Sequence, residues 1–235
     1  MNWRLHPFLE LESTNTLALQ WLREGRAQAG DVILAEVQTA GRGRQGRVWH
    51  SPCGMLIMTA VLPFRLERLG WTSLAAGIAT AQAVNDLGAD AGVKWPNDVW
   101  LRGGKLAGIL VETAGGELAA VGIGMNVVNP LPDRSRLANP ATRLADWLPH
   151  VTVEAVLDRV LVRLAACWEL LDEPEISALR TQWEALDTTV GRSLRWSSGN
   201  VTGVARGVDE QGALIIETAQ AEIHHAAVGE VTFLS

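Results

Sequence analysis

The chain has 235 residues, of which 48% are hydrophobic, and its formal net charge at pH 7 is −6. This length allows one main domain with a sizeable core and a small second one. The acidic balance argues against a broad nucleic-acid-binding face, because such faces need many Lys and Arg contacts to phosphates. Two cysteines, Cys53 and Cys167, are too few for a disulfide framework or a cysteine-rich zinc site and fit a reducing compartment.

The chain shows no targeting or membrane-spanning segment. The first residues, MNWRLHPFLELEST, contain no apolar run of signal-peptide length. No stretch reaches the roughly 18 apolar residues that a membrane-spanning helix needs. The sequence therefore predicts a cytoplasmic protein without membrane contact.

Hydrophobic periodicity predicts helices and strands in alternation over the first part of the chain. The expected helices are 16–23, 66–87, 152–171 and 174–186, and the expected strands are 31–38, 55–62, 93–101, 105–112 and 117–127. Glycine-rich turns at 102–104 and 114–116 favour antiparallel hairpins among the last three strands. A proline-containing loop is expected over 129–140.

The C-terminal part reads differently, as short β segments only. These are 193–196, 201–208, 213–217, 221–226 and 230–234. Together they predict a small barrel. A unit of this size is too small to be very stable alone, so we expect it to pack against the main domain. We therefore divide the chain into a main domain, 1–187, and a C-terminal domain, 188–235.

A cationic loop lies between the first two expected strands. Residues 41–47 read Gly-Arg-Gly-Arg-Gln-Gly-Arg, so Arg42, Arg44 and Arg47 reverse the local charge of an acidic chain. Guanidinium groups suit carboxylates and phosphates, and the glycines let backbone N–H groups approach an anion. The pattern predicts a pocket for a small anion. A solvated basic turn and a nucleic-acid patch are the alternatives.

A second polar group is the segment KWPND, residues 94–98. Its proline interrupts sheet pairing and exposes neighbouring side chains at a site edge. A hairpin would bring Asp98 close to Lys105, where the carboxylate could orient the ammonium or share a divalent metal with a phosphate. A simple surface ion pair is the alternative.

Neutral hydrogen-bonding groups gather near two element ends. Ser13, Thr14 and Gln38 together supply donors and acceptors, which suits a neutral polar ring such as a urea. The alternative for the Ser13 segment is a helix N-cap. The five histidines show no zinc-ligand spacing, and no G-x-S-x-G segment marks a nucleophilic serine.

Taken together, these segments resemble the motifs of biotin protein ligases, also called biotin–[acetyl-CoA-carboxylase] ligases. The motifs are, in order, STN from Ser13, AEVQTAGRGRQGRVW from Ala35, KWPND from Lys94, KLAGILVE from Lys105 and GIGMNV from Gly122. The similarity continues through WEALD at Trp183 to the C-terminus. Five motifs in one order are far more specific than any one of them.

The resemblance implies an α+β fold. Its main part is a class II aminoacyl-tRNA synthetase-like mixed sheet with helices on one side, followed by an SH3-like barrel. It also implies two half-reactions, in which biotin and ATP give biotinyl-5′-AMP with Mg²⁺, and a lysine of a biotin carboxyl carrier domain then takes the biotin. Many relatives carry a DNA-binding winged helix before the catalytic domain. Ser13 comes too early for one, so no DNA partner is expected, whereas a homodimer is.

The resemblance also implies roles for individual residues. Lys105, Arg44 and Asp98 match catalytic positions, and Asp98 is the expected Mg²⁺ ligand. The biotin-contacting positions match Ser13, Thr14, Asn15, Gln38, Arg42, Gly43, Arg44 and Lys105, and the nucleotide-contacting ones match Arg42, Arg47, Trp49, Asn97, Lys105 and Asn126. Strict strand alternation would put Lys105 and Gly108 on opposite faces, so neither Gly108 nor Leu110 is expected in the pocket. His50, Cys53 and Met125 depart from the family's motifs.

Two rival functions stay open from the sequence. A lipoate or octanoate transferase of the same fold would attach a different acyl chain to a related carrier domain. Such relatives typically carry an R-R-x-x-G-G-G segment, where this chain has GRGRQGR. The other rival is a non-catalytic binding module for nucleic acid or for a protein partner.

Overall fold

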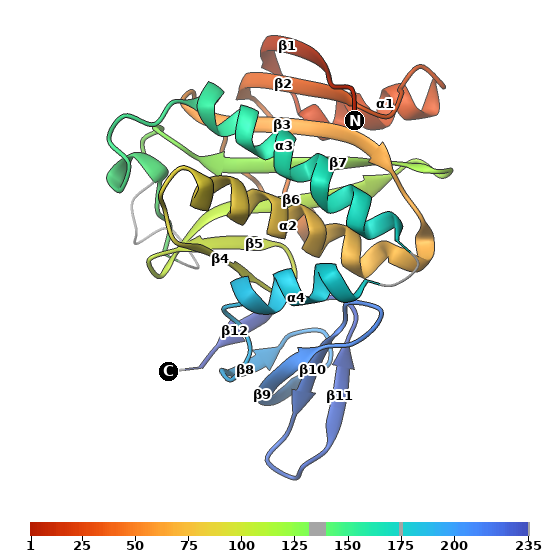
Figure 1. The fold of residues 1–235 in the computed structure, drawn as a ribbon, viewed down its shortest axis with the longest axis vertical. Coiled ribbons are helices and arrows are strands. Elements are labelled where there is room, and N and C mark those ends of the chain that lie inside the picture. Colours follow the sequence, from red (N-terminus) through yellow and green to blue (C-terminus); the bar gives the residue numbers. More distant parts are fainter. Residues whose placement is uncertain (132–139, 174–175, 235) are drawn as a thin grey trace.

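The computed structural model describes residues 1–131, 140–173 and 176–234. Within these ranges the chain forms two sheets (Figure 1). The larger has seven strands in the order β1-β2-β3-β7-β6-β5-β4, and the smaller has five in the order β11-β10-β9-β8-β12. Of the part of the chain described, no helix is long and apolar enough to cross a membrane.

The larger sheet is mixed. Its strands are β1 (Arg4–Leu11), β2 (Asp31–Gln38), β3 (Met55–Pro63), β4 (Ala91–Lys94), β5 (Asp98–Leu101), β6 (Gly104–Thr113) and β7 (Leu118–Asn126). β1 pairs with β2 in parallel, and each of the other neighbouring pairs is antiparallel. The mixed sheet predicted from the sequence is confirmed.

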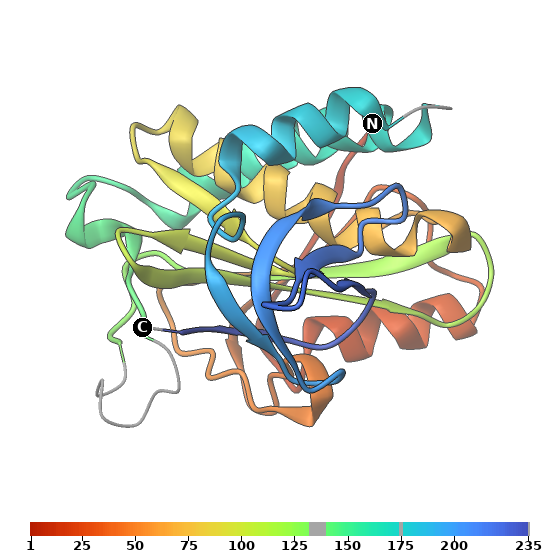
Figure 2. The same ribbon diagram turned by 90° about the horizontal axis from the view of Figure 1, so that it is seen from below.

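Helices cover both faces of this sheet, not one. α2 (Leu69–Asp86), α3 (Val153–Asp172) and α4 (Ser177–Leu186) lie on one face, whereas α1 (Thr14–Arg23) lies alone on the other (Figure 2). Alternation along β2 shows the division, since Val32 packs into the core with α2 and Ile33 packs with Ala18 of α1. The prediction of helices on one side therefore holds for three helices and is wrong for α1.

Two strand predictions near the sheet edges also need correction. The single strand expected over 93–101 is two strands, β4 and β5, because the chain reverses at Trp95–Asn97 around Pro96, which has no N–H to donate to a ladder. β1 was not expected at all. It is an edge strand with a proline and with Leu5 and Leu9 exposed, so it lacks the apolar alternation of a buried strand.

The smaller sheet contains β8 (Ser193–Trp196), β9 (Val201–Val208), β10 (Leu214–Glu217), β11 (Ile223–Ala226) and β12 (Val231–Phe233). All of its pairs are antiparallel. Leu214 and Ile216 join the same apolar core as α2, and the indole nitrogen of Trp71 donates to the Glu210 carbonyl over 2.9 Å. The C-terminal domain thus packs directly against the main one.

Most other predicted elements agree with the structure to within two residues. The exceptions in extent are the helix expected over 66–87, which begins with a 3-10 turn at Leu66–Arg68, and the helix expected from Pro174, which begins at Ser177. Pro174 itself and most of the loop expected over 129–140 lie outside the described residues. The division of the chain at residue 187 stays a prediction.

Candidate active site

A cavity of about 720 Å³ opens on the α1 side of the large sheet. Its walls come from the N-terminus of α1, the end of β2, strands β6 and β7, and residues 41–47, which we call the glycine-arginine loop. Twelve of the thirteen predicted site residues line it: Ser13, Thr14, Asn15, Gln38, Arg42, Gly43, Arg44, Arg47, Trp49, Asn97, Lys105 and Asn126. Asp98 is the exception.

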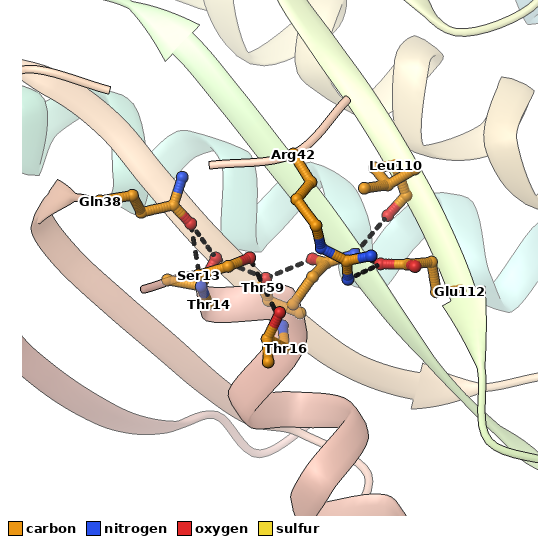
Figure 3. Close-up of polar contacts among 9 residues, drawn as sticks. Ser13, Thr14, Thr16, Gln38, Arg42, Thr59, Leu110 and Glu112 are labelled. Atoms are coloured by element: carbon orange, nitrogen blue, oxygen red, sulfur yellow. Dashed lines mark hydrogen bonds and ion pairs between the residues drawn. The ribbon is translucent and has the colours of Figure 1, made fainter. Parts of the chain in front are cut away.

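The neutral wall of the cavity is held by hydrogen bonds at the start of α1 (Figure 3). Gln38 Oε1 accepts from the Thr14 backbone N–H over 2.8 Å, and Gln38 Nε2 donates to Ser51 Oγ over 2.8 Å. Ser13 both lines the cavity and caps α1, since its Oγ accepts from Thr16 N over 3.4 Å. The two roles considered for the Ser13 segment therefore coexist.

Asn15 occupies a fixed position beneath this wall. Its Oδ1 lies 2.6 Å from Thr59 Oγ1, and its Nδ2 donates to the Leu110 carbonyl over 3.1 Å and to Glu112 Oε2 over 2.9 Å. Because an amide oxygen only accepts and an amide nitrogen only donates, these partners fix the orientation of the amide. Asn15 is 4% exposed, so the arrangement is sheltered from bulk water.

Each arginine of the glycine-arginine loop contacts a different part of the chain. Arg42 Nη2 donates to Glu112 Oε2 at the end of β6 over 2.8 Å, as Figure 3 shows. Arg44 Nη1 donates to Asn97 Oδ1 over 3.1 Å, and Arg47 forms an ion pair with Glu230 of the C-terminal domain. Burial lowers the pKa of Arg44, and the negative charge of Asp98 opposes that shift.

Lys105 and Asp98 meet across the β5–β6 hairpin, as the sequence predicted. Lys105 Nζ lies 2.6 Å from Asp98 Oδ1. The ammonium also lies 5.3 Å from the centroid of the Trp49 ring, a favourable cation–π distance. Since Lys105 lines the cavity and Asp98 does not, the carboxylate stands behind the ammonium and orients it.

The exclusion of Gly108 and Leu110 from the pocket was wrong. Both residues line the cavity together with Lys105. The register between β5 and β6 shifts at Val99/Trp100, so that Trp100 faces Lys105 while Val99 faces Ala107. This bulge breaks strict alternation and brings Lys105 and Gly108 onto one face.

Two glycines of β7 make room for site side chains. A Cβ at Gly122 would lie 2.2 Å from Asn15 Oδ1, and a Cβ at Gly124 would lie 2.4 Å from Trp49 Nε1. Neither distance is compatible with a side chain at that position. The glycines of the GIGMNV segment therefore let Asn15 and Trp49 lie directly on the sheet.

Asn97 and Asn126 are both anchored by backbone groups. Asn97 Nδ2 donates to the Ile109 carbonyl over 2.8 Å, and Asn126 Nδ2 donates to the Thr142 carbonyl over 3.1 Å.

Among the residues that depart from the family's motifs, His50 lines the cavity, whereas Cys53 and Met125 do not.

Lys94 lies behind the site rather than in it. Its Nζ lies 4.8 Å from the ring centroid of Trp100 and 4.6 Å from that of Phe233 in β12. Burial lowers the pKa of this ammonium, and the negative charge of Asp98 opposes that shift. Lys94 thus contacts the C-terminal domain through the ring of Phe233.

Sequence reasoning missed three supporting residues, Ser51, Thr59 and Glu112. Glu112 ends the KLAGILVE segment that carried the resemblance, which was the available signal. Thr59 has no exposed surface, and it had no signal, because a threonine in an apolar strand reads as a β-branched core residue.

The described residues contain no group of three or more His, Cys, Asp or Glu side chains that could hold a metal ion by themselves. Mg²⁺ commonly uses one or two carboxylates and takes its other ligands from substrate phosphates and water. Of the residues expected near such an ion, Asn97 lines the cavity, whereas Asp98, the expected Mg²⁺ ligand, lies behind it and is paired with Lys105.

Comparisons with known proteins agree with this geometry. Residues 8–127, just over half of the chain, match the Biotin/lipoate A/B protein ligase family, and residues 194–234 match the Biotin protein ligase C terminal domain. The bifunctional ligase/repressor BirA of Escherichia coli is 36% identical over 88% of this chain and 67% of its own length. The biotin–[acetyl-CoA-carboxylase] ligase of Mycobacterium tuberculosis is 34% identical over 92% of this chain and 84% of its own.

A solved structure is similar over the whole fold. The biotin protein ligase of Aquifex aeolicus in complex with biotin and ATP superimposes with a TM-score of 0.86 at 27% identity, covering 98% of both chains. The family match, the sequence identities and the fold similarity agree with one another. The chain therefore belongs to the Biotin/lipoate A/B protein ligase family, among its biotin protein ligases.

Proposed function

We propose that this protein activates biotin with ATP to form biotinyl-5′-AMP and pyrophosphate, and then transfers biotin to a lysine of a biotin carboxyl carrier domain. The observation that carries the proposal is the composition of the cavity. One space of about 720 Å³ holds a neutral hydrogen-bonding wall around Gln38 and a cationic wall with Arg44 and Lys105. The first wall suits a ureido ring, and the second suits a carboxylate meeting a phosphate.

In the first half-reaction two anions must approach each other. Lys105 and the arginines of the glycine-arginine loop offset that repulsion and stabilise charge that spreads over the phosphoryl oxygens. Asp98 acts through Lys105, because its carboxylate lies 2.6 Å from the ammonium and keeps it directed into the cavity. Asn97 supports Arg44 in the same way over 3.1 Å.

Mg²⁺ would enter with ATP, held by the phosphates with Asp98 and Asn97 nearby. The ion supplies electrostatic stabilisation of the departing pyrophosphate when it is bound. The protein side chains supply the remainder, since they orient the acid and exclude water from the anhydride.

In the second half-reaction the amine of the acceptor lysine attacks the carbonyl carbon of the anhydride. A bond between nitrogen and carbon forms, AMP leaves with the electron pair, and the amine loses a proton. Cations that contact the α-phosphate stabilise the leaving AMP, and Arg44 is placed for this on the cavity wall.

The test is direct formation of the adenylate. The protein is mixed with ATP, Mg²⁺ and either biotin or lipoate, and the products are identified by mass spectrometry. Biotinyl-5′-AMP is the expected product. Lipoyl-AMP alone would favour the lipoate rival, and neither product would favour a binding module.

The acceptor and the assembly extend the same proposal. A purified biotin carboxyl carrier domain should gain one biotin on lysine when it is added to the reaction. The homodimer expected from the resemblance is tested by the mass of the protein in solution, with and without biotin and ATP.

A further inference from the structure

We propose that Trp95 is a positioning residue through which the C-terminal domain holds Asn97 in place on the cavity wall. The inference rests on the proposed function for its kinetic part. Its starting observation is a pair of buried indoles that donate to one turn, the β9–β10 turn at residues 209–213. Trp95 Nε1 donates to the Gly212 carbonyl over 3.1 Å, and Trp71 Nε1 donates to the Glu210 carbonyl over 2.9 Å.

The β9–β10 turn is a firm support for these indoles. Asp209 Oδ1 accepts from the backbone N–H groups of Gln211 and Ala213, each over 2.9 Å, and Asp209 Oδ2 lies 2.7 Å from His225 Nδ1. The turn also packs closely against the start of α2, since a Cβ at Gly70 would lie 2.1 Å from the Gln211 carbonyl oxygen. A turn that is closed by its own side chain and packed this tightly fixes the position of the groups that bind to it.

Trp95 is held at a second point, through its backbone. Its N–H donates to Thr189 Oγ1 over 3.0 Å, and Thr189 has no exposed surface. Thr189 and Gly212 both follow α4 in the sequence, whereas Trp95 lies in the KWPND segment between β4 and β5. The side chain and the backbone of Trp95 are thus both fixed from outside the large sheet.

The KWPND segment reaches the cavity two residues after Trp95. Asn97 lines the cavity, its carbonyl accepts from the Ile109 N–H over 2.8 Å, and its Oδ1 accepts from Arg44 Nη1 over 3.1 Å. Only Pro96 lies between Trp95 and Asn97, and its ring restricts rotation of the backbone. A displacement of Trp95 is therefore passed on to Asn97 because no flexible residue separates them.

The expected consequence is a selective loss of nucleotide affinity. Asn97 is one of the residues expected to contact the nucleotide, whereas the wall around Gln38 is held by its own hydrogen bonds to Thr14 and Ser51. Trp95→Phe keeps an aromatic ring but loses the N–H. Its KM for ATP in adenylate formation should rise about three- to tenfold, the factor that corresponds to one hydrogen bond, and its KM for biotin should stay near the wild-type value.

Trp71→Phe is the matched control, because it removes the same group from a contact with the same turn. Trp71 lies at the start of α2, and Ser73 Oγ in that helix donates to the Pro96 carbonyl over 3.2 Å. Most of α2 is buried in the core, so the loss of one hydrogen bond at its start should not move it. Both variants should show a similar fall in melting temperature, but only Trp95→Phe should raise the KM for ATP.

A second variant addresses the same residue through its backbone contact. Thr189→Val keeps the shape of the side chain but removes the oxygen that accepts from the Trp95 N–H. It should raise the KM for ATP and leave the KM for biotin unchanged, as in Trp95→Phe, and it decides the question if Trp95→Phe does not fold. Wild-type values of both constants in Thr189→Val would contradict the inference.

Hydrogen exchange provides a readout that needs no substrate. The Ile109 amide donates to the Asn97 carbonyl, so its exchange rate, measured by NMR without ligand, reports whether Asn97 is held. This amide should exchange faster in Trp95→Phe than in Trp71→Phe.

Equal exchange of the Ile109 amide in the two tryptophan variants would overturn the inference, as would an equal rise in their KM values for ATP. The exchange result is independent of the proposed function. If the wild type forms no adenylate, the reaction assignment fails, yet hydrogen exchange still decides whether Trp95 holds Asn97.

Discussion

One face of the large sheet packs into the core and the other forms the cavity, and successive residues of β7 alternate between the two. Val121, Ile123 and Met125 point into the core beneath α2 and α3 and are almost fully buried. On the other face, Gly122 and Gly124 make way for site side chains, and Asn126 lines the cavity. One strand thus contributes alternately to stability and to chemistry.

The two faces of β7 need different kinds of residue. The core face needs volume, so its residues are large and apolar. The cavity face needs close approach, so its residues are small, and polar side chains from α1 and from the segment after the loop lie against them. Substitutions on the core face should therefore change the free energy of unfolding, and those on the cavity face should change activity.

The largest effect is expected for Lys105→Ala. It removes a cation that lines the cavity, so adenylate formation should fall about a thousandfold because charge on the phosphoryl oxygens loses a fixed partner. Pyrophosphate release measures the rate, and the melting temperature should change little. Arg102→Gln is the matched control, since Arg102 is an exposed cation of the same hairpin. Similar losses in both variants would contradict the assignment.

The two faces can be compared directly on β7. Met125→Ala should lower the free energy of unfolding by about 2–5 kcal/mol because it leaves a cavity in the core, where Met125 is fully buried and does not line the site cavity. Gly124→Ala should instead displace Trp49, so its main effect is lost activity, with about 1–3 kcal/mol of destabilisation from overpacking. Urea unfolding and adenylate assays on both variants provide the comparison. The comparison fails if Met125→Ala proves the less active of the two when both are fully folded.

Arg44→Ala should sharpen the role of the glycine-arginine loop. Without this cation the loop loses its contact to Asn97 and closes less well, so biotinyl-AMP should escape about tenfold or more faster. The readout is labelling of lysines on a bystander protein without a carrier domain. If the variant retains its adenylate as long as the wild type, the loop does not protect the intermediate.

The smallest effect concerns Asp31, far from the cavity. Burial raises the pKa of this carboxyl, but hydrogen bonds from Gln28, His6 and Arg4 outweigh burial, and the net pKa is lowered below the usual 3.8. A lowered folded pKa adds stability above the unfolded pKa, and this stability is lost as the pH falls through the folded one.

Asp31→Asn should therefore cost about 1 kcal/mol at pH 7 and progressively less below pH 4. Urea unfolding of the variant and the wild type, at pH 7 and at a pH below 4, measures the difference. Glu36→Gln, an exposed carboxylate of the same strand, is the control. A cost that is independent of pH would show that the charge of Asp31 is not what stabilises this end of the sheet.

Much of this organisation could be predicted from the sequence. The hydrophobic periodicity of segments such as 31–38 and the helix that begins near Val153 correctly predicted their secondary structure. The motifs that resemble biotin protein ligases named most of the residues that line the cavity. The failures have local causes. The β5–β6 bulge broke the alternation that excluded Gly108, and Pro96 divided one expected strand into two. The position of α1 depends on long-range packing, which periodicity does not report.

The chain's two lysines have a chemical consequence. Lys94 is buried between Trp100 and Phe233, and Lys105 is paired with Asp98. Every other basic side chain apart from histidine is an arginine, which stays protonated and is a poor nucleophile. A protein that generates an amine-reactive anhydride thus holds both of its lysine ammonium groups in contacts within the fold, so acylation of its own lysines should be slow.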